Sequence, residues 1–145
     1  MLGHVSIHVA DRNASTKFYL ESLAPLSYKS TEFPKVTGIG PSDSSVPIPC
    51  LWLHQHDLQE REKSGPIHIS FYVDKRQQVD DFYARAIEAG GKSNGAPGKR
   101  PYMDNYYCTH SEAIQTSSVT DMRLEAAYVF DLDGNNIEAV CFKDN

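Results

Sequence analysis

An internal repeat limits the possible fold of this 145-residue chain more than any other feature. When the sequence is shifted by 64 positions, the segments that begin at His4 and His68 align without a gap. The identical pairs are His4/His68, Ser6/Ser70, Val9/Val73, Arg12/Arg76, Phe18/Phe82 and Tyr19/Tyr83. Self-similarity of this kind marks duplicated structural units. The sequence therefore predicts a single domain over residues 1–145 with two modules, one over about 1–60 and the other over about 65–145.

Each repeat begins with a predicted strand whose two faces differ in chemistry. Apolar residues occupy every second position of the segments 5–9 and 69–73. Because successive side chains of a strand point to opposite faces, His4 and His68 lie on the faces opposite the apolar ones. We expect the apolar faces to be covered by helices, which turns both histidines toward the hollow of the sheets.

A helix is predicted after each of these strands. The first covers about Asn13–Leu23, and the second is centred on apolar positions at helical spacing between Val79 and Ile87. For the second helix, Asp74 and Gln77 are predicted to form the N-terminal capping box. The pair Gly90-Gly91 is predicted to end it.

Strand-like runs complete both modules, and Asp133-Gly134 indicates a hairpin between the last two. These runs are about Leu26–Phe33, Val36–Ile39 and Ile48–His54 in the first module, and a stretch interrupted by Gly and Pro from Gly91, Ala126–Asp131 and Ile137–Phe142 in the second. The fold class predicted is α+β: two tandem βαβββ modules that form a cupped mixed β-sheet with helices on its outer face.

Composition and charge exclude several classes of function. The net charge is −5 and no basic cluster exceeds Lys99-Arg100, so neither nucleic acid nor an anionic membrane is an expected partner. Three distant cysteines, Cys50, Cys108 and Cys141, form neither a disulfide framework nor a zinc-binding pair. The sequence also has no apolar span of about 20 residues and begins directly with a strand pattern. A cytoplasmic protein is therefore expected.

The two strand histidines and one carboxylate form a candidate metal site. In the last predicted strand, Ile137, Ala139 and Cys141 share the apolar face, which leaves Glu138 on the face that carries the histidines. Two imidazoles and a carboxylate suit one divalent ion, with zinc, manganese, iron and nickel all compatible. The plainer alternatives are a hydrogen-bonded structural histidine and an exposed glutamate after a turn. The matched placement of His4 and His68 across the repeat favours the metal site.

These residues resemble the vicinal oxygen chelate superfamily, which includes glyoxalases, bleomycin resistance proteins and extradiol dioxygenases. The matching stretches are His4-Val5-Ser6 with Phe18-Tyr19, residues 65–69 with Phe82-Tyr83, and residues 131–138, in which Leu132 replaces the usual proline. The resemblance implies paired βαβββ modules that hold a metal ion in a cup, and a homodimer. It also implies a small-molecule substrate whose neighbouring oxygens chelate the metal. The superfamily hosts several reactions and also metal-free binding proteins, so the fold alone does not identify the reaction.

The chain departs from the glyoxalase I pattern at the last strand of the first module. That pattern supplies a fourth ligand, a glutamate, which also transfers protons, whereas the far side of this strand offers Cys50, Trp52 and His54. Trp52 is predicted to occupy the position of the glutamate. For His54 two interpretations stay open: a catalytic base or fourth ligand, or an exposed histidine at a strand end. A second departure is an insertion over about 108–125, either a lid over the cup or a surface excursion without a role.

The remaining candidate residues are expected near the mouth of the cup. Arg100 has the chemistry to bind a substrate carboxylate or phosphate, and tyrosines can stack on a ring or act as general acids. The predicted substrate-binding residues are Trp52, Tyr72, Arg100, Tyr102 and Tyr106, and the predicted catalytic residues are His54, Tyr107 and Glu138. The function predicted is a metal-dependent glyoxalase-like lyase or isomerase. The alternatives are an iron-dependent dioxygenase and a non-catalytic small-molecule-binding or resistance protein.

Overall fold

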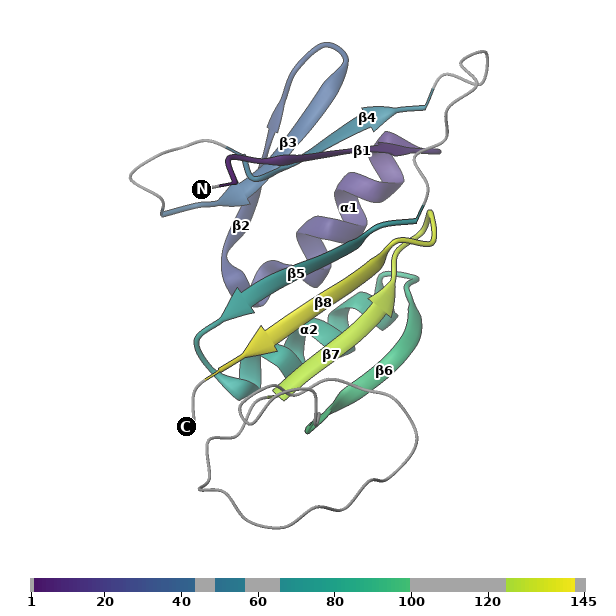
Figure 1. Cartoon of the computed structure of the whole chain (residues 1–145). Coiled ribbons are helices and arrows are strands. Elements are labelled where there is room, and N and C mark those ends of the chain that lie inside the picture. Colours follow the sequence, from purple (N-terminus) through teal and green to yellow (C-terminus); the bar gives the residue numbers. More distant parts are fainter. Residues whose placement is uncertain (1, 44–48, 57–65, 100–124, 143–145) are drawn as a thin grey trace.

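The computed structural model describes residues 2–43, 49–56, 66–99 and 125–142, and they form two modules of the same design (Figure 1). The first module contains β1 (Val5–Val9), α1 (Arg12–Ser22), a short 3-10 helix η1 (Ala24–Leu26), β2 (Tyr28–Glu32), β3 (Val36–Pro41) and β4 (Leu51–Gln55). The second contains β5 (His68–Val73), α2 (Arg76–Glu88), β6 (Lys92–Lys99), β7 (Glu125–Phe130) and β8 (Asn136–Cys141). The predicted α+β class with two βαβββ modules is confirmed.

Each module builds a four-stranded mixed sheet with the same strand order. The orders are β1-β4-β3-β2 and β5-β8-β7-β6, so the first and last strands of each module lie side by side and run parallel. The remaining neighbours are antiparallel. Ser6 is paired with Trp52 in one sheet, and Ser70 with Glu138 in the other, so the repeat seen in the sequence extends to the strand register.

The two helices cover the apolar faces of the sheets. α1 packs on the first sheet and α2 on the second, and the helices also pack against each other behind the strands (Figure 1). The helix-facing apolar side chains of β1, β4, β5 and β8 belong to a single buried cluster together with Phe18, Tyr19 and Phe82 of the helices. Opposite this core, each sheet has a second face that points away from its helix, here called the far face.

Local signals explain where the helices begin and end. α1 follows Asp11, whose side chain accepts a hydrogen bond from the Ala14 backbone N–H. The prediction that Asp74 and Gln77 cap α2 is wrong by one residue, because the Lys75 backbone N–H donates to the Gln78 side chain instead. The predicted stop is confirmed: Gly90 has a φ of 101°, a conformation that favours glycine.

The stretch after Gly91, predicted to be interrupted by its Gly and Pro residues, forms the edge strand β6, whose pairing with β7 has two register shifts. An edge position tolerates Pro97, because a strand at the edge of a sheet leaves one row of its backbone groups unpaired. The expected insertion over about 108–125 lies outside the described residues except at its end, where Glu125 already begins β7.

The Asp133-Gly134 turn joins the two modules as well as β7 to β8. Asp131 accepts hydrogen bonds from the backbone N–H groups of Asp133 and Asn135, which shape the turn. It also accepts the Tyr19 hydroxyl of α1 at 2.6 Å. Asp133 reaches the first module too, where it accepts from the Ala10 backbone N–H at 2.7 Å and from the Ser15 hydroxyl at 3.1 Å. The turn therefore fixes the first module against the second.

Candidate functional site

Among the described residues, the most deeply buried acidic group on a far face is Glu138 of β8. Its strand neighbours Ile137 and Ala139 point into the helix-covered core, so strand alternation sends Glu138 to the other side. The side chain is nevertheless fully buried at 0% exposure. Burying an ionised carboxylate is costly unless hydrogen bonds or an opposite charge compensate it, so the partners of Glu138 define the site.

Two side chains from the neighbouring strands hold the Glu138 carboxylate. The Tyr128 hydroxyl of β7 donates to its Oε1 at 2.9 Å, and Nε2 of His68, the first residue of β5, lies 3.0 Å from its Oε2. The rings of His68 and Tyr128 are also neighbours, with centroids 5.7 Å apart. The His68 side chain is 48% exposed. Tyr128 thus fixes Glu138 from inside the protein, and the half-exposed His68 connects it to the surface.

Tyr128 is a site residue that the sequence analysis missed. It lies directly opposite Glu138 in the β7–β8 hairpin. Counting back from the predicted Asp133-Gly134 turn would have identified this pairing, because a hairpin turn fixes which residues face each other. Tyr128 is only 3% exposed and forms a small buried cluster with Ala126 and Val140 on the far face.

On the first sheet, His4 has an aromatic neighbour instead of a carboxylate. Trp52 occupies the register position that Glu138 has in the second sheet, since both are paired with the serine two residues after the histidine. The His4 and Trp52 rings meet edge to face with centroids 6.2 Å apart. Phe33 adds a third ring, 5.3 Å from Trp52 and 43% exposed. This face therefore offers aromatic surface beside His4.

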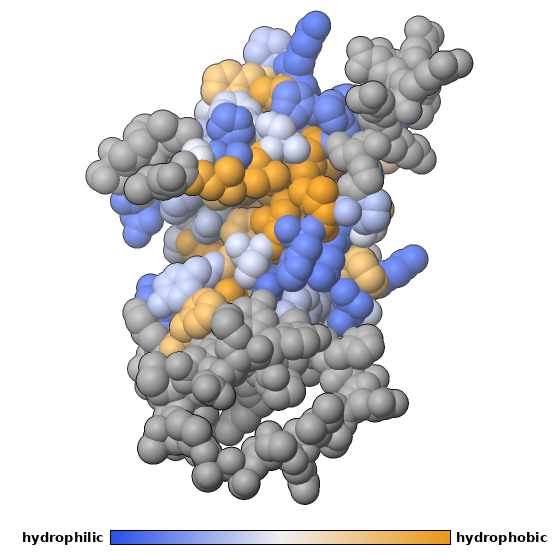
Figure 2. Space-filling view, viewed as in Figure 1, coloured by the Kyte–Doolittle hydropathy of each residue, from blue (hydrophilic) through white to orange (hydrophobic). Residues whose placement is uncertain are grey.

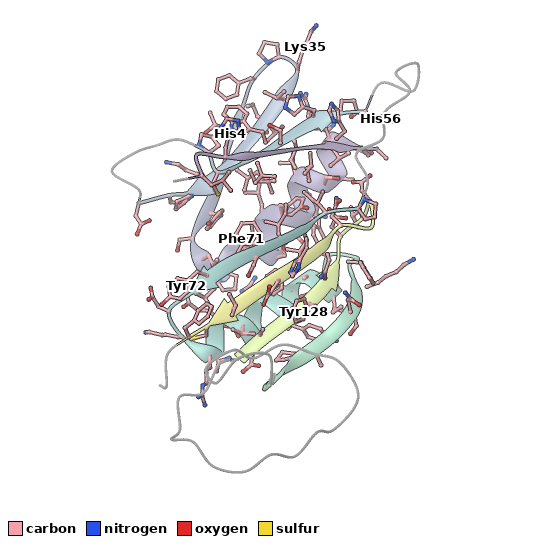
Figure 3. All side chains as sticks on the ribbon, viewed as in Figure 1. His4, Lys35, His56, Phe71, Tyr72 and Tyr128 are labelled. Carbon is pink, nitrogen blue, oxygen red and sulfur yellow. The ribbon has the colours of Figure 1, made fainter. Side chains whose placement is uncertain are left out.

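Within one chain, the structure does not bring His4 together with His68 and Glu138. β1 and β5 belong to different sheets and run in opposite directions (Figure 1), so the histidines that begin them lie at opposite ends of the two strands. Figure 3 shows the same arrangement, with His4 and Tyr72, near the end of β5, on one side of the view and His56, just after β4, on the other. Among the described residues, no group of three or more His, Cys, Asp and Glu side chains is placed to hold an ion.

His54 of β4 lies on the far face of the first sheet, away from Glu138. It is paired with His8 of β1, and the two rings are 5.3 Å apart. Burial, and then the nearby His8, lower the pKa of His54 below its usual value. A lowered pKa keeps the imidazole neutral at physiological pH, the form that accepts a proton or binds a metal.

The other candidates are on β5 or outside the described part of the chain. Tyr72 is 52% exposed and stacks on Phe142, with ring centroids 5.8 Å apart. Tyr72 belongs to the same strand as His68 and follows it by four residues, so both side chains are on the far face. The predicted residues outside the described segments are Arg100, Tyr102, Tyr106 and Tyr107.

Comparison with known protein families agrees with the fold described above. The family model for the Glyoxalase/Bleomycin resistance protein/Dioxygenase superfamily matches residues 1–139. No curated protein sequence matches the chain. Neither of the two described α-helices is long and apolar enough to cross a membrane.

Several solved structures share the fold at low sequence identity. A glyoxalase/bleomycin resistance protein from Albidiferax ferrireducens T118 is 20% identical with a TM-score of 0.64, and the match covers 95% of each chain. A glyoxalase/bleomycin resistance protein/dioxygenase family enzyme from Burkholderia phytofirmans PsJN is 20% identical with a TM-score of 0.65, covering 97% of this chain and 98% of the other. A glyoxalase-related enzyme from Fulvimarina pelagi is 16% identical with a TM-score of 0.65, covering 97% and 87%.

Proposed function

Since the chain belongs to the Glyoxalase/Bleomycin resistance protein/Dioxygenase superfamily, we propose that it is a divalent-metal-dependent enzyme of the glyoxalase type, a lyase or isomerase. Its substrate is a small molecule with neighbouring oxygen atoms. Its metal ligands are His68 and Glu138 of one chain and His4 of a second copy. The alternative ring-cleaving dioxygenase would use the same donor set with iron.

The observation that carries this proposal is the contact between His68 and a fully buried Glu138. The two atoms 3.0 Å apart, His68 Nε2 and Glu138 Oε2, are an imidazole nitrogen and a carboxylate oxygen, the donors that zinc, manganese, iron and nickel accept. Glu138 is held in place by Tyr128 on its other oxygen, which leaves Oε2 directed at the histidine. The residues present therefore fit one half of a metal site.

The third ligand is the reason for proposing a homodimer. Since β1 and β5 are edge strands and begin at opposite ends, the chain alone does not place His4 beside Glu138. Edge strands with unpaired backbone groups are natural places for association. Figure 2 shows apolar side chains gathered between the two sheets on this side of the molecule, a surface that a second copy would cover. In the dimer, the first sheet of one copy would face the second sheet of the other.

In this arrangement each side chain has a defined task. When bound, the ion would supply Lewis acidity to negative charge that develops on a substrate oxygen. Trp52 and Phe33 of the first sheet would bind the apolar part of the substrate, together with Tyr72 and the predicted residues Arg100, Tyr102 and Tyr106. Tyr107 and, while no cation is bound to it, His54, neutral because of its lowered pKa, are the proposed groups for proton transfer.

Elemental analysis of the dialysed protein tests the proposal. We expect about one tightly bound divalent ion per chain, lost in Glu138→Gln, His68→Ala and His4→Ala. His56→Ala is the matched control, because His56 follows β4 on the first sheet and lies outside the proposed ligand set; it retains the ion. The metal-loaded protein is then screened against hemithioacetals, epoxides and catechols. A metal-free wild type, or an ion that persists in Glu138→Gln, contradicts the proposal.

A second candidate function is sequestration of a planar compound without chemistry. The aromatic side chains of the first sheet favour it, because Trp52 occupies the register position that Glu138 has in the second sheet and lies next to the rings of both His4 and Phe33. Aromatic rings of this kind stack on flat ligands. The metal analysis separates the two candidates: a sequestering protein would bind an aromatic probe equally well before and after Glu138→Gln and would hold no tight ion.

A further inference from the structure

We propose that His8 and His54 form a second binding site, separate from Glu138, for a borderline divalent cation such as zinc, copper or nickel. Both histidines lie on the far face of the first sheet, on adjacent parallel strands and directly opposite each other in register. Along the sequence, His8 is four residues after His4, which is a proposed ligand of the first site. The other two proposed ligands, His68 and Glu138, belong to the second sheet.

The spacing of the two rings matches what one ion requires. A metal–nitrogen bond of about 2.0–2.1 Å places the ion about 3.2 Å from the centre of each imidazole ring. With a tetrahedral angle at the ion, the two ring centres are then about 5.2 Å apart. The observed separation between the centroids of His8 and His54 is 5.3 Å, with the ring planes inclined by 41°. The strand pairing therefore already holds the two ring centres at the separation that one shared ion requires.

The backbone beneath the two rings is held by several hydrogen bonds. Gln55, the residue after His54, donates from its side chain to the Ala10 carbonyl at 2.6 Å and accepts from the Arg12 backbone N–H at 3.0 Å. The His56 backbone N–H donates to the Val9 carbonyl at 2.8 Å. These contacts join the end of β1 to the end of β4 just after the histidine pair. Ligands on rigid, paired strands are preorganised, which favours binding.

The chemistry of the pair also suits a cation. A metal ligand must be a neutral imidazole, and the lowered pKa of His54 keeps it in that form at neutral pH. Two imidazole nitrogens satisfy half of a tetrahedral site and select borderline ions over magnesium or calcium, which prefer oxygen ligands. The remaining positions would be taken by water or by an oxygen or nitrogen donor of a small ligand.

The experiment is a calorimetric titration of the full-length Glu138→Gln protein with zinc and, separately, with nickel. This background removes the site of the proposed function, so the result does not depend on it. We expect about one equivalent to bind, weakly enough that dialysis removes it because only two protein side chains hold it, and we expect that equivalent to be lost when His8→Phe or His54→Ala is added. His8→Phe keeps a ring beside His54 and removes only the nitrogen donors. His56→Ala, on the same strand end, retains the equivalent.

Copper provides a second readout. In the electron paramagnetic resonance spectrum of the copper-loaded protein, we expect hyperfine splitting from two imidazole nitrogens, reduced in His8→Phe. The proposal is overturned if the Glu138→Gln protein binds no zinc, nickel or copper, if His8→Phe and His54→Ala bind as well as their parent, or if His56→Ala loses the equivalent to the same extent. Thermal unfolding midpoints equal to that of the parent show that each variant is folded.

Discussion

Removal of one hydroxyl, by Tyr19→Phe, is expected to weaken the attachment of the first module to the second. The Tyr19 hydroxyl donates to Asp131 at 2.6 Å, and both side chains are buried. A buried hydrogen bond to a charged group contributes about 1.5–3 kcal/mol. Asp131 keeps its three other donors, two backbone N–H groups and the Asn135 amide. We therefore expect a loss of about 2 kcal/mol, equivalent to a fall of about 4–8 °C in the unfolding midpoint for a domain of this size.

The repeat supplies the matched control for this measurement. Tyr83 occupies the position of Tyr19 in the second module, but its hydroxyl donates to the Ser93 hydroxyl at an exposed site. Tyr83→Phe should change the free energy of unfolding by less than about 0.5 kcal/mol. Chemical denaturation of both variants at neutral pH measures the difference. If Tyr19→Phe is no less stable than Tyr83→Phe, the hydrogen bond between Tyr19 and Asp131 does not hold the two modules together.

The titration of Tyr19 determines how the stability difference between wild type and Tyr19→Phe changes with pH. Burial, and then the charge of Asp131, raise the pKa of Tyr19 well above its usual value. The unfolded chain, with a tyrosine pKa of about 10, therefore loses this proton before the folded chain does. The stability contributed by the neutral hydroxyl is fully present below pH 10 and falls as the pH rises above it. Since phenylalanine does not titrate, the stability difference between wild type and Tyr19→Phe should narrow above that pH.

Two further substitutions test the site and the packing. Tyr128→Phe removes the hydrogen bond that positions Glu138, and should lower the affinity for the tightly bound ion by about 10–100-fold, measured by competition with a chelator; an unchanged affinity would show that Tyr128 does not orient this ligand. Gly91→Ala would place its Cβ 2.5 Å from Val129 Cγ1 and should lower the free energy of unfolding by about 1–3 kcal/mol. Gly3→Ala, whose Cβ would have nothing within 4 Å, should leave that free energy unchanged. Equal stabilities of the two variants would contradict the packing described.

The sequence predicted those parts of the fold that local patterns encode. The repeat and the two-residue alternation of the strands predicted both modules and the far-face position of Glu138, because alternation alone determines which side chains leave the core. The glycine stop of α2 follows from a φ of 101° that other residues rarely adopt. The cap at Lys75 was missed because neighbouring residues offered an equally plausible capping pair.

The relative placement of the modules was not predictable in the same way. It depends on the packing of α1 against α2 and on the hydrogen bonds from Asp131 and Asp133 to α1 and the residues before it. These contacts join residues more than one hundred positions apart, and no local pattern encodes them. For this reason the sequence placed His4 and His68 on equivalent strand positions without showing that they lie at opposite ends within one chain.

The most direct test of the shared metal site is subunit complementation. Chains carrying His4→Ala and Glu138→Gln are purified separately, mixed under conditions that exchange subunits, and isolated as heterodimers through two different affinity tags. Each parent homodimer should hold no tightly bound ion, because every site lacks one ligand. The heterodimer should regain one ion per dimer, since one of its two sites combines the intact His4 of one chain with the intact Glu138 of the other. A heterodimer that stays as metal-free as its parents would contradict a site shared between two copies.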